Sequence, residues 1–137
     1  KQTDECYLKM AFTWASMSRA NKLKVGCLIV KDRTIISDGF NGTPKGFHTN
    51  QCENASNKTY PEVLHAESNA LMKLARQNTI GSDGATAYIT AAPCFDCSKL
   101  LVQAGIKRVV YADTYKPQDK SIRFLESCDI ETVKLDF

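Results

Sequence analysis

Two short motifs that lie far apart in the chain place the strongest constraint on its fold. The first is His65-Ala66-Glu67 and the second is Pro93-Cys94-Phe95-Asp96-Cys97. One imidazole and two thiolates form a donor set for zinc that leaves the fourth tetrahedral position free for water, as in catalytic rather than structural zinc sites. Any fold that serves this purpose must bring the two motifs together.

The spacing within each motif predicts that both motifs lie at helix N-termini. Residues i and i+2 lie on opposite sides of a regular helix, so His65 and Glu67 can face one metal only if a helix begins at about His65. Cys94 and Cys97 are three positions apart, and Pro93 favours a helix start, so both sulfurs project from one first turn. The positive ends of the two helix dipoles are expected to lower the pKa values of the thiols.

The charge of the site indicates its chemistry. Zinc with two thiolates and a neutral imidazole has no net charge, and water bound to such a zinc can lose its proton near neutral pH. Glu67, which is not a ligand, is then free to move protons. This pattern of residues is that of zinc-dependent nucleobase deaminases. A redox pair or a structural zinc site remains the alternative, although the chain has no second Cys-x-x-Cys or His-x-x-x-His motif.

The composition predicts one globular domain, residues 1–137, in a reducing compartment. Of the six cysteines, two belong to the metal motif, and Cys27 and Cys128 lie in apolar patterns typical of buried free thiols. We find no signal peptide and no membrane-spanning run, so a cytoplasmic location is expected. The net charge of +3, without a block of basic residues, suits an anionic small molecule and argues against nucleic acid.

The order of the predicted elements indicates an α/β fold. A first helix is expected to begin near Thr3 or Asp4, and residues 25–40 form two strands of a hairpin. The later elements are predicted at 65–77 (helix), 86–90 (strand), 94–104 (helix), 108–112 (strand), 122–128 (helix) and 130–135 (strand). This alternation predicts a three-layer α/β/α sandwich with one mixed five-stranded sheet and the metal at the end of the sheet.

Two further segments carry open alternatives. Residues 39–46 are rich in glycine and form either a simple turn or a substrate loop in which Asn41 supplies a donor and an acceptor. Residues 47–60 are polar and read as a long surface loop, and loops of this length are often functional. Within that loop, His48 and Cys52 lie four positions apart, and a second metal site there remains open.

The chain resembles the cytidine and deoxycytidylate (dCMP) deaminase superfamily over nearly its whole length, and within it the deoxycytidylate deaminase branch. The stretches that carry the resemblance are 25–26, 39–46, 60–70 and 93–97. The resemblance implies a cytidine deaminase-like fold and hydrolysis of the 4-amino group of dCMP to give dUMP and ammonia. It implies one zinc per chain, bound by His65, Cys94 and Cys97, with Glu67 as the catalytic proton carrier.

The resemblance also implies contacts to nucleotides. Ala66 would bind the cytosine O2 through its backbone N–H, Asn41 the sugar, and Tyr115 and Lys116 the 5′-phosphate. Family members are typically homohexamers that are activated by dCTP and inhibited by dTTP with Mg²⁺. The effector contacts carried over to this chain are Lys22, Lys24, Asn41 and Gly42.

One departure and two alternatives limit what the resemblance implies. Several relatives carry a cysteine before Val25, where this chain has Arg-Ala-Asn-Lys at 19–22, so the second, structural zinc of those relatives is not expected here. A deaminase of dCTP, cytidine, cytosine or tRNA adenosine would use the same zinc chemistry. A non-enzymatic zinc module that binds nucleic acid or protein is the alternative from another class.

Overall fold

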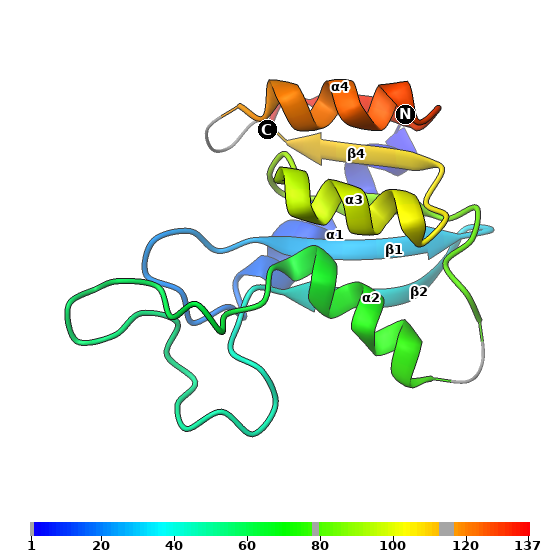
Figure 1. Cartoon of the computed structure of the whole chain (residues 1–137). Coiled ribbons are helices and arrows are strands. Elements are labelled where there is room, and N and C mark those ends of the chain that lie inside the picture. The colour runs from blue at the N-terminus through cyan, green and yellow to red at the C-terminus, as the bar shows by residue number, and fades with distance from the viewer. Residues whose placement is uncertain (1, 78–79, 113–116) are drawn as a thin grey trace.

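The computed structural model describes residues 2–77, 80–112 and 117–137, and a mixed five-stranded sheet organises them. The strands lie in the order β2-β1-β3-β4-β5 (Figure 1). Their bounds are β1 (Gly26–Lys31), β2 (Thr34–Phe40), β3 (Thr86–Ile89), β4 (Arg108–Ala112) and β5 (Glu131–Leu135). The helices are α1 (Gln2–Ala15), α2 (Ala66–Arg76), α3 (Phe95–Gln103) and α4 (Asp119–Ser127).

The pairing of the strands follows from the lengths of their connections. β1 and β2 form an antiparallel hairpin, and β1 also pairs antiparallel with β3. β3, β4 and β5 are parallel, and the connections between them contain α3 and α4, because parallel neighbours need a crossover. The sheet is therefore mixed, as the sequence predicts.

Helices cover both faces of the sheet and complete the three predicted layers. Figure 1 shows α2, α3 and α4 in front of the sheet and α1 behind it. Alternate residues of β1 enter the two cores: Ile29 packs on the side of the three helices, and Leu28 packs on the side of α1. Because β1 is covered on both faces, its residues Gly26–Val30 are all buried, which explains the apolar run in the sequence. The three-layer α/β/α prediction is confirmed.

The start of α1 differs from the prediction. α1 begins at Gln2, so Asp4 lies inside the helix and does not cap it. Asp4 is buried and accepts hydrogen bonds from two residues of the sheet, Tyr88 and Arg108. The sequence pattern shows an acidic residue near a helix start, and this pattern does not distinguish a cap from a buried ion pair.

Gly39 in β2 allows α2 to lie directly on the sheet. A Cβ atom at Gly39 would lie 2.5 Å from the carbonyl oxygen of Ala66 and 2.7 Å from the nitrogen of Ala70. A hydrogen bond fixes the same contact, because the Ser37 hydroxyl donates to the carbonyl oxygen of Ala70 at 2.6 Å. The first turns of α2 are therefore placed by close backbone contact with β2.

The connection between β2 and α2 is long and extends away from the sheet (Figure 1). It is not irregular throughout, because it contains two isolated antiparallel bridges, Gly42 with Leu64 and Glu53 with Thr59. The prediction of a long loop for 47–60 is correct, but this loop has internal backbone pairing. No helix within the described ranges combines the length and the apolar character that a membrane crossing requires.

Candidate active site

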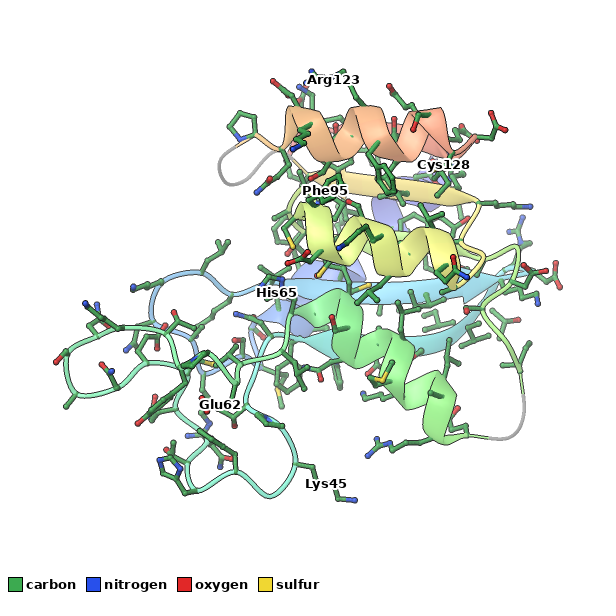
Figure 2. All side chains as sticks on the ribbon, in the orientation of Figure 1. Lys45, Glu62, His65, Phe95, Arg123 and Cys128 are labelled. Carbon is green, nitrogen blue, oxygen red and sulfur yellow. The ribbon has the colours of Figure 1, made fainter. Side chains whose placement is uncertain are left out.

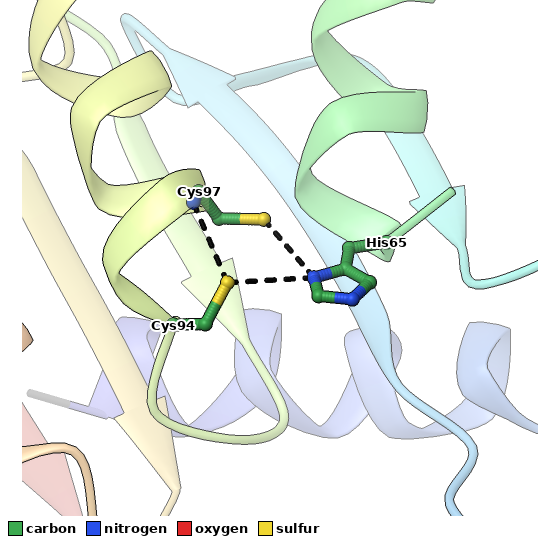
Figure 3. A group of neighbouring side chains, drawn as sticks. All are labelled: His65, Cys94 and Cys97. Carbon is green, nitrogen blue, oxygen red and sulfur yellow. Dashed lines mark hydrogen bonds between the residues drawn. The ribbon is translucent and has the colours of Figure 1, made fainter. Parts of the chain in front are cut away.

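The side chains of the two sequence motifs meet between the N-termini of α2 and α3 (Figure 3). The Nδ1 atom of His65 lies 3.3 Å from the Sγ atom of Cys97 and 3.5 Å from the Sγ atom of Cys94. His65 has an extended backbone immediately before α2, and its carbonyl oxygen accepts the N–H of Asn69 at 3.0 Å. The helix start near His65 is as predicted.

The two cysteines lie at the start of α3, with Cys97 in its first turn. Cys94 has an extended backbone immediately before the helix, and its sulfur accepts the backbone N–H of Cys97 at 3.5 Å. Hydrogen bonds from the side chains of Cys97 and His65 lower the pKa of Cys94 to about 4. The thiolate, the form that ligates metals, is therefore favoured at Cys94. The prediction that both thiols have lowered pKa values is wrong for Cys97, because its hydrogen bond to Cys94 and its burial raise its pKa.

The donor set fits zinc. The ligand atoms of His65, Cys94 and Cys97 all lie within 4.8 Å of one another, and no other group of three or more such residues occurs among the described residues. An imidazole and two thiolates are typical zinc ligands, and three protein donors are characteristic of catalytic rather than structural zinc. The chemistry of the side chains thus supports the sequence-based choice of metal.

Glu67 lies beside this group in the first turn of α2. Only 4% of its surface is exposed, and burial raises the pKa of its carboxyl group to about 7. A carboxyl group with a pKa near the working pH can both accept and release a proton. The position and burial of Glu67 therefore suit proton transfer next to the metal centre.

A cleft of about 470 Å³ opens onto these residues, a volume in the range of small-ligand sites. Among the residues that line it are His65, Glu67 and Cys94. The remaining lining comes from Ala66, Ala91, Ala92, Gln118 and Asn41, and from parts of the segments 20–25 and 52–63. The cleft thus lies at the end of the sheet where β1 begins and β3 ends, as the fold predicts.

The structure places the predicted nucleotide contacts in different surroundings. Ala66 and Asn41 line the cleft, and Ala66 is the first residue of α2, where N–H groups lack an acceptor within the helix. The side chain of Asn41 binds backbone: its Oδ1 accepts the N–H of Val25, and its Nδ2 donates to the carbonyl oxygen of Leu23, both at 2.9 Å. Tyr115 and Lys116 lie outside the described residues.

The four predicted effector contacts do not share one cleft. Lys22 and Asn41 line the larger cleft, whereas Gly42 lines a second cleft of about 290 Å³. Lys24 is not among the lining residues of either cleft. The effector role of this group stays a prediction.

Nothing in the described residues supports a second metal at His48 and Cys52. Neither belongs to a group of three possible ligands. The His48 ring packs against aromatic neighbours, with its centroid 4.4 Å from that of Phe47 and 5.7 Å from that of Tyr60.

Sequence reasoning missed Glu53, Tyr60 and Gln118 as cleft residues. Glu53 belongs to a segment without periodicity or motif, so no local pattern marks it, whereas Tyr60 is the first residue of the stretch 60–70 that carries the family resemblance. One feature of the sequence could have drawn attention to Glu53, because it is the sole carboxylate between residues 39 and 61.

Comparison with known proteins gives consistent results. The family model described as the cytidine and deoxycytidylate deaminase zinc-binding region matches residues 1–113. The deoxycytidylate deaminase of Saccharomyces cerevisiae is 34% identical over 144 residues, which cover 98% of this chain and 45% of the yeast protein. The chain thus spans about half the length of that relative. The deoxycytidylate deaminase of Mycobacterium phage D29 is 37% identical over 79% of this chain and 92% of its own length.

A solved structure is similar over the whole fold. It is the dCMP deaminase of cyanophage S-TIM5 in complex with dCMP and dUMP, which is 42% identical with a TM-score of 0.91 and covers 98% of this chain and 97% of its own. The extent of the family match and the agreement of sequence and fold lead to one conclusion: the chain belongs to the cytidine and deoxycytidylate deaminase family.

Proposed function

We propose that this chain is a zinc-dependent dCMP deaminase, a single domain over residues 1–137 that converts dCMP and water to dUMP and ammonia. One observation carries the proposal: the buried carboxyl group of Glu67 lies beside a zinc donor set at a cleft of nucleotide-compatible size. The similarity to a phage dCMP deaminase in complex with dCMP and dUMP supports the choice of substrate.

The roles of the chain's residues follow from their chemistry. His65, Cys94 and Cys97 would bind one zinc ion, which acts as a Lewis acid that makes the attacking water more acidic. Glu67 accepts one proton from that water and delivers it to N3 of the cytosine ring; it then accepts the remaining proton from the oxygen on C4 and delivers it to the departing amino group. The C4–N bond breaks, the oxygen of water stays on C4, and ammonia leaves.

Binding of the substrate would use groups at the rim of the same cleft. The N–H of Ala66 is free of an intrahelical acceptor and would donate to the cytosine O2. Asn41 has one N–H and one lone pair beyond its two backbone hydrogen bonds, and these would contact the sugar. Tyr115 and Lys116 remain our candidates for the 5′-phosphate.

We carry the regulatory properties of the family over as part of the proposal. The enzyme would be a cytoplasmic homohexamer that is activated by dCTP and inhibited by dTTP with Mg²⁺, through Lys22, Lys24, Asn41 and Gly42. The six cysteines are all free, which suits a reducing compartment. Light scattering tests the hexamer, and addition of dCTP or of dTTP with Mg²⁺ to the dCMP assay tests the regulation.

A panel of substrates tests the activity itself. dCMP, dCTP, cytidine, cytosine and an RNA hairpin containing adenosine are assayed side by side for release of ammonia. We expect the highest kcat/KM for dCMP. Preference for dCTP, for the RNA or for an unphosphorylated substrate would overturn the substrate assignment. A zinc-loaded protein that deaminates none of the five would favour the non-enzymatic zinc module.

A further inference from the structure

The carboxylate of Glu53 connects two segments that line the cleft, and it does so without contacting the zinc donors. Both of its oxygens lie 3.0 Å from the backbone nitrogen of Asn21, and Oε2 also accepts the N–H of Lys22 at 3.3 Å. Only 6% of Glu53 is exposed. A buried carboxylate therefore holds consecutive N–H groups of a distant segment.

A short hairpin presents Glu53 in this position. The N–H of Tyr60 donates to the carbonyl oxygen of Cys52, and the N–H of Asn54 donates to that of Lys58, both at 2.8 Å. The side chain of Asn54 closes the turn, because its Oδ1 accepts the N–H groups of Ser56 and Lys58. Glu53 thus extends from a structured element, which reduces the entropy lost when its carboxylate is fixed.

The segment that Glu53 holds is also fixed at both ends. The Ser18 hydroxyl donates to the carbonyl oxygen of Asn41 at 2.8 Å, and the Asn41 amide binds Leu23 and Val25. The middle of the segment, residues 21–22, is attached by Glu53. These three attachments place Lys22 and Leu23 at the cleft.

The partners of Glu53 indicate that its carboxylate positions the backbone and does not neutralise a neighbouring positive charge. No ion pair of Glu53 occurs among the residues that the structure describes. A buried carboxylate needs strong hydrogen bonds to offset its desolvation, and backbone N–H groups provide them in one fixed geometry. A neutral or shorter side chain cannot hold residues 21 and 22 equally well.

We propose that Glu53 is a positioning residue that fixes Lys22 and Leu23 against the bound nucleotide and so sets the affinity for substrate, not the rate of the chemical step. The ammonium group of Lys22 supplies a cation for an anionic nucleotide, and Leu23 supplies an apolar contact. This inference rests on the proposed function, since it assumes that the cleft binds a nucleotide.

The experiment compares Glu53→Ala and Glu53→Gln with a matched control, Glu62→Gln. Glu62 is an exposed carboxylate on the same connecting segment (Figure 2) and does not line the cleft. For each variant, kcat and KM for dCMP are measured, together with zinc content, melting temperature and hydrogen exchange of peptides that cover residues 18–25.

We expect Glu53→Ala to raise KM by about tenfold, because it removes hydrogen bonds to a charged group, and to change kcat by less than about threefold. Exchange at residues 18–25 becomes faster, and zinc content is unchanged. Glu53→Gln keeps one oxygen acceptor, so we expect a smaller rise in KM. If Glu53→Ala does not fold, the rise in KM of Glu53→Gln tests the inference. Glu62→Gln behaves as the wild-type chain.

Three results would overturn the inference: an unchanged KM with faster exchange, unchanged exchange at residues 18–25, or a loss of kcat at constant KM. A wild-type protein that does not deaminate dCMP would refute the proposed function instead. In that case the exchange measurement, which needs no substrate, still tests whether Glu53 holds residues 21–22. KM is then measured with the substrate that the panel identifies.

Discussion

The carboxylate of Asp4 in α1 binds the guanidinium group of Arg108 in β4 through two hydrogen bonds, of 2.8 Å and 2.6 Å. The hydroxyl of Tyr88 in β3 donates to the same carboxylate at 2.7 Å. This group lies on the face of the sheet opposite to α2 and α3 and attaches α1 to two central strands. It therefore contributes to stability and not to the cleft.

Asp4→Asn tests this contribution and its dependence on pH. Hydrogen bonding to Arg108 is the main cause that lowers the pKa of Asp4 from 3.8 to about 2. Because the pKa is lower in the folded chain, the stabilisation is present above about pH 4 and is lost as the pH falls from about 4 to about 2. We expect the free energy of unfolding of Asp4→Asn to be lower by about 2 kcal/mol at pH 7. Urea unfolding at pH 7 and at about pH 3 measures the difference, which should shrink at the lower pH; a difference that is equal at both pH values would contradict the assignment.

Glu67→Gln tests the role of the buried carboxyl group. The substitution preserves the shape of the side chain but removes its ability to accept a proton, so turnover of dCMP should fall by about 10²- to 10⁴-fold. Zinc content should stay at about one ion per chain, because Glu67 is not in the donor set. Atomic absorption and steady-state kinetics measure the two quantities. A variant with nearly full activity would refute the proton carrier.

Cys97→Ser, with Cys128→Ser as its control, tests the metal centre. Cys128 was predicted to be buried, but it is an exposed free thiol that follows α4, and it lies far from His65 in Figure 2. We expect Cys97→Ser to weaken zinc binding by more than about 100-fold, since loss of a ligand exceeds the effect of losing an outer hydrogen bond. Cys128→Ser should bind zinc normally. Competition with a chromogenic chelator measures the affinities, and wild-type activity removed by the chelator should return on addition of zinc. Equal zinc affinity of the two variants would exclude Cys97 as a ligand.

Asn41→Asp tests the structural use of the Asn41 amide. The carboxylate can still accept the N–H of Val25, but it faces the carbonyl oxygen of Leu23 with a second acceptor. We expect a loss of stability of about 1–3 kcal/mol, at least as large as that of Asn41→Ala. Asn50→Ala, at an exposed asparagine of the same connection, should have little effect. Thermal unfolding measures all three variants, and wild-type stability of Asn41→Asp would argue that the amide is free to serve a ligand alone.

The sequence predicted the order of strands and helices well, because most elements have local signals. The apolar run of β1 marks a strand covered on both faces, and the spacing of Cys94 and Cys97 marks a helix start. Pairs of residues that are distant in the chain have no such signal. The contact of Glu53 with Asn21 and that of Asp4 with Arg108 each depend on the complete fold, so neither was predicted.

Asn41 shows a different limit of sequence reasoning. A polar residue in a glycine-rich stretch suggested a ligand contact, and the structure shows the amide bound to backbone on two sides. An asparagine that binds a ligand and one that binds backbone cannot be distinguished from the sequence pattern alone. The proposed phosphate contacts, Tyr115 and Lys116, lie outside the described residues and stay predictions.

The close contact at Gly39 has a consequence for the chemistry of the metal. His65 immediately precedes a helix that rests on β2, whereas both sulfurs lie at the start of a helix that follows β3. A single methyl group at position 39 would push the first of these helices outward and carry the imidazole away from its two partners. The position of the imidazole thus depends on a residue without a side chain that lies under the helix. We expect substitutions at position 39 to reduce zinc binding more than they reduce overall folding.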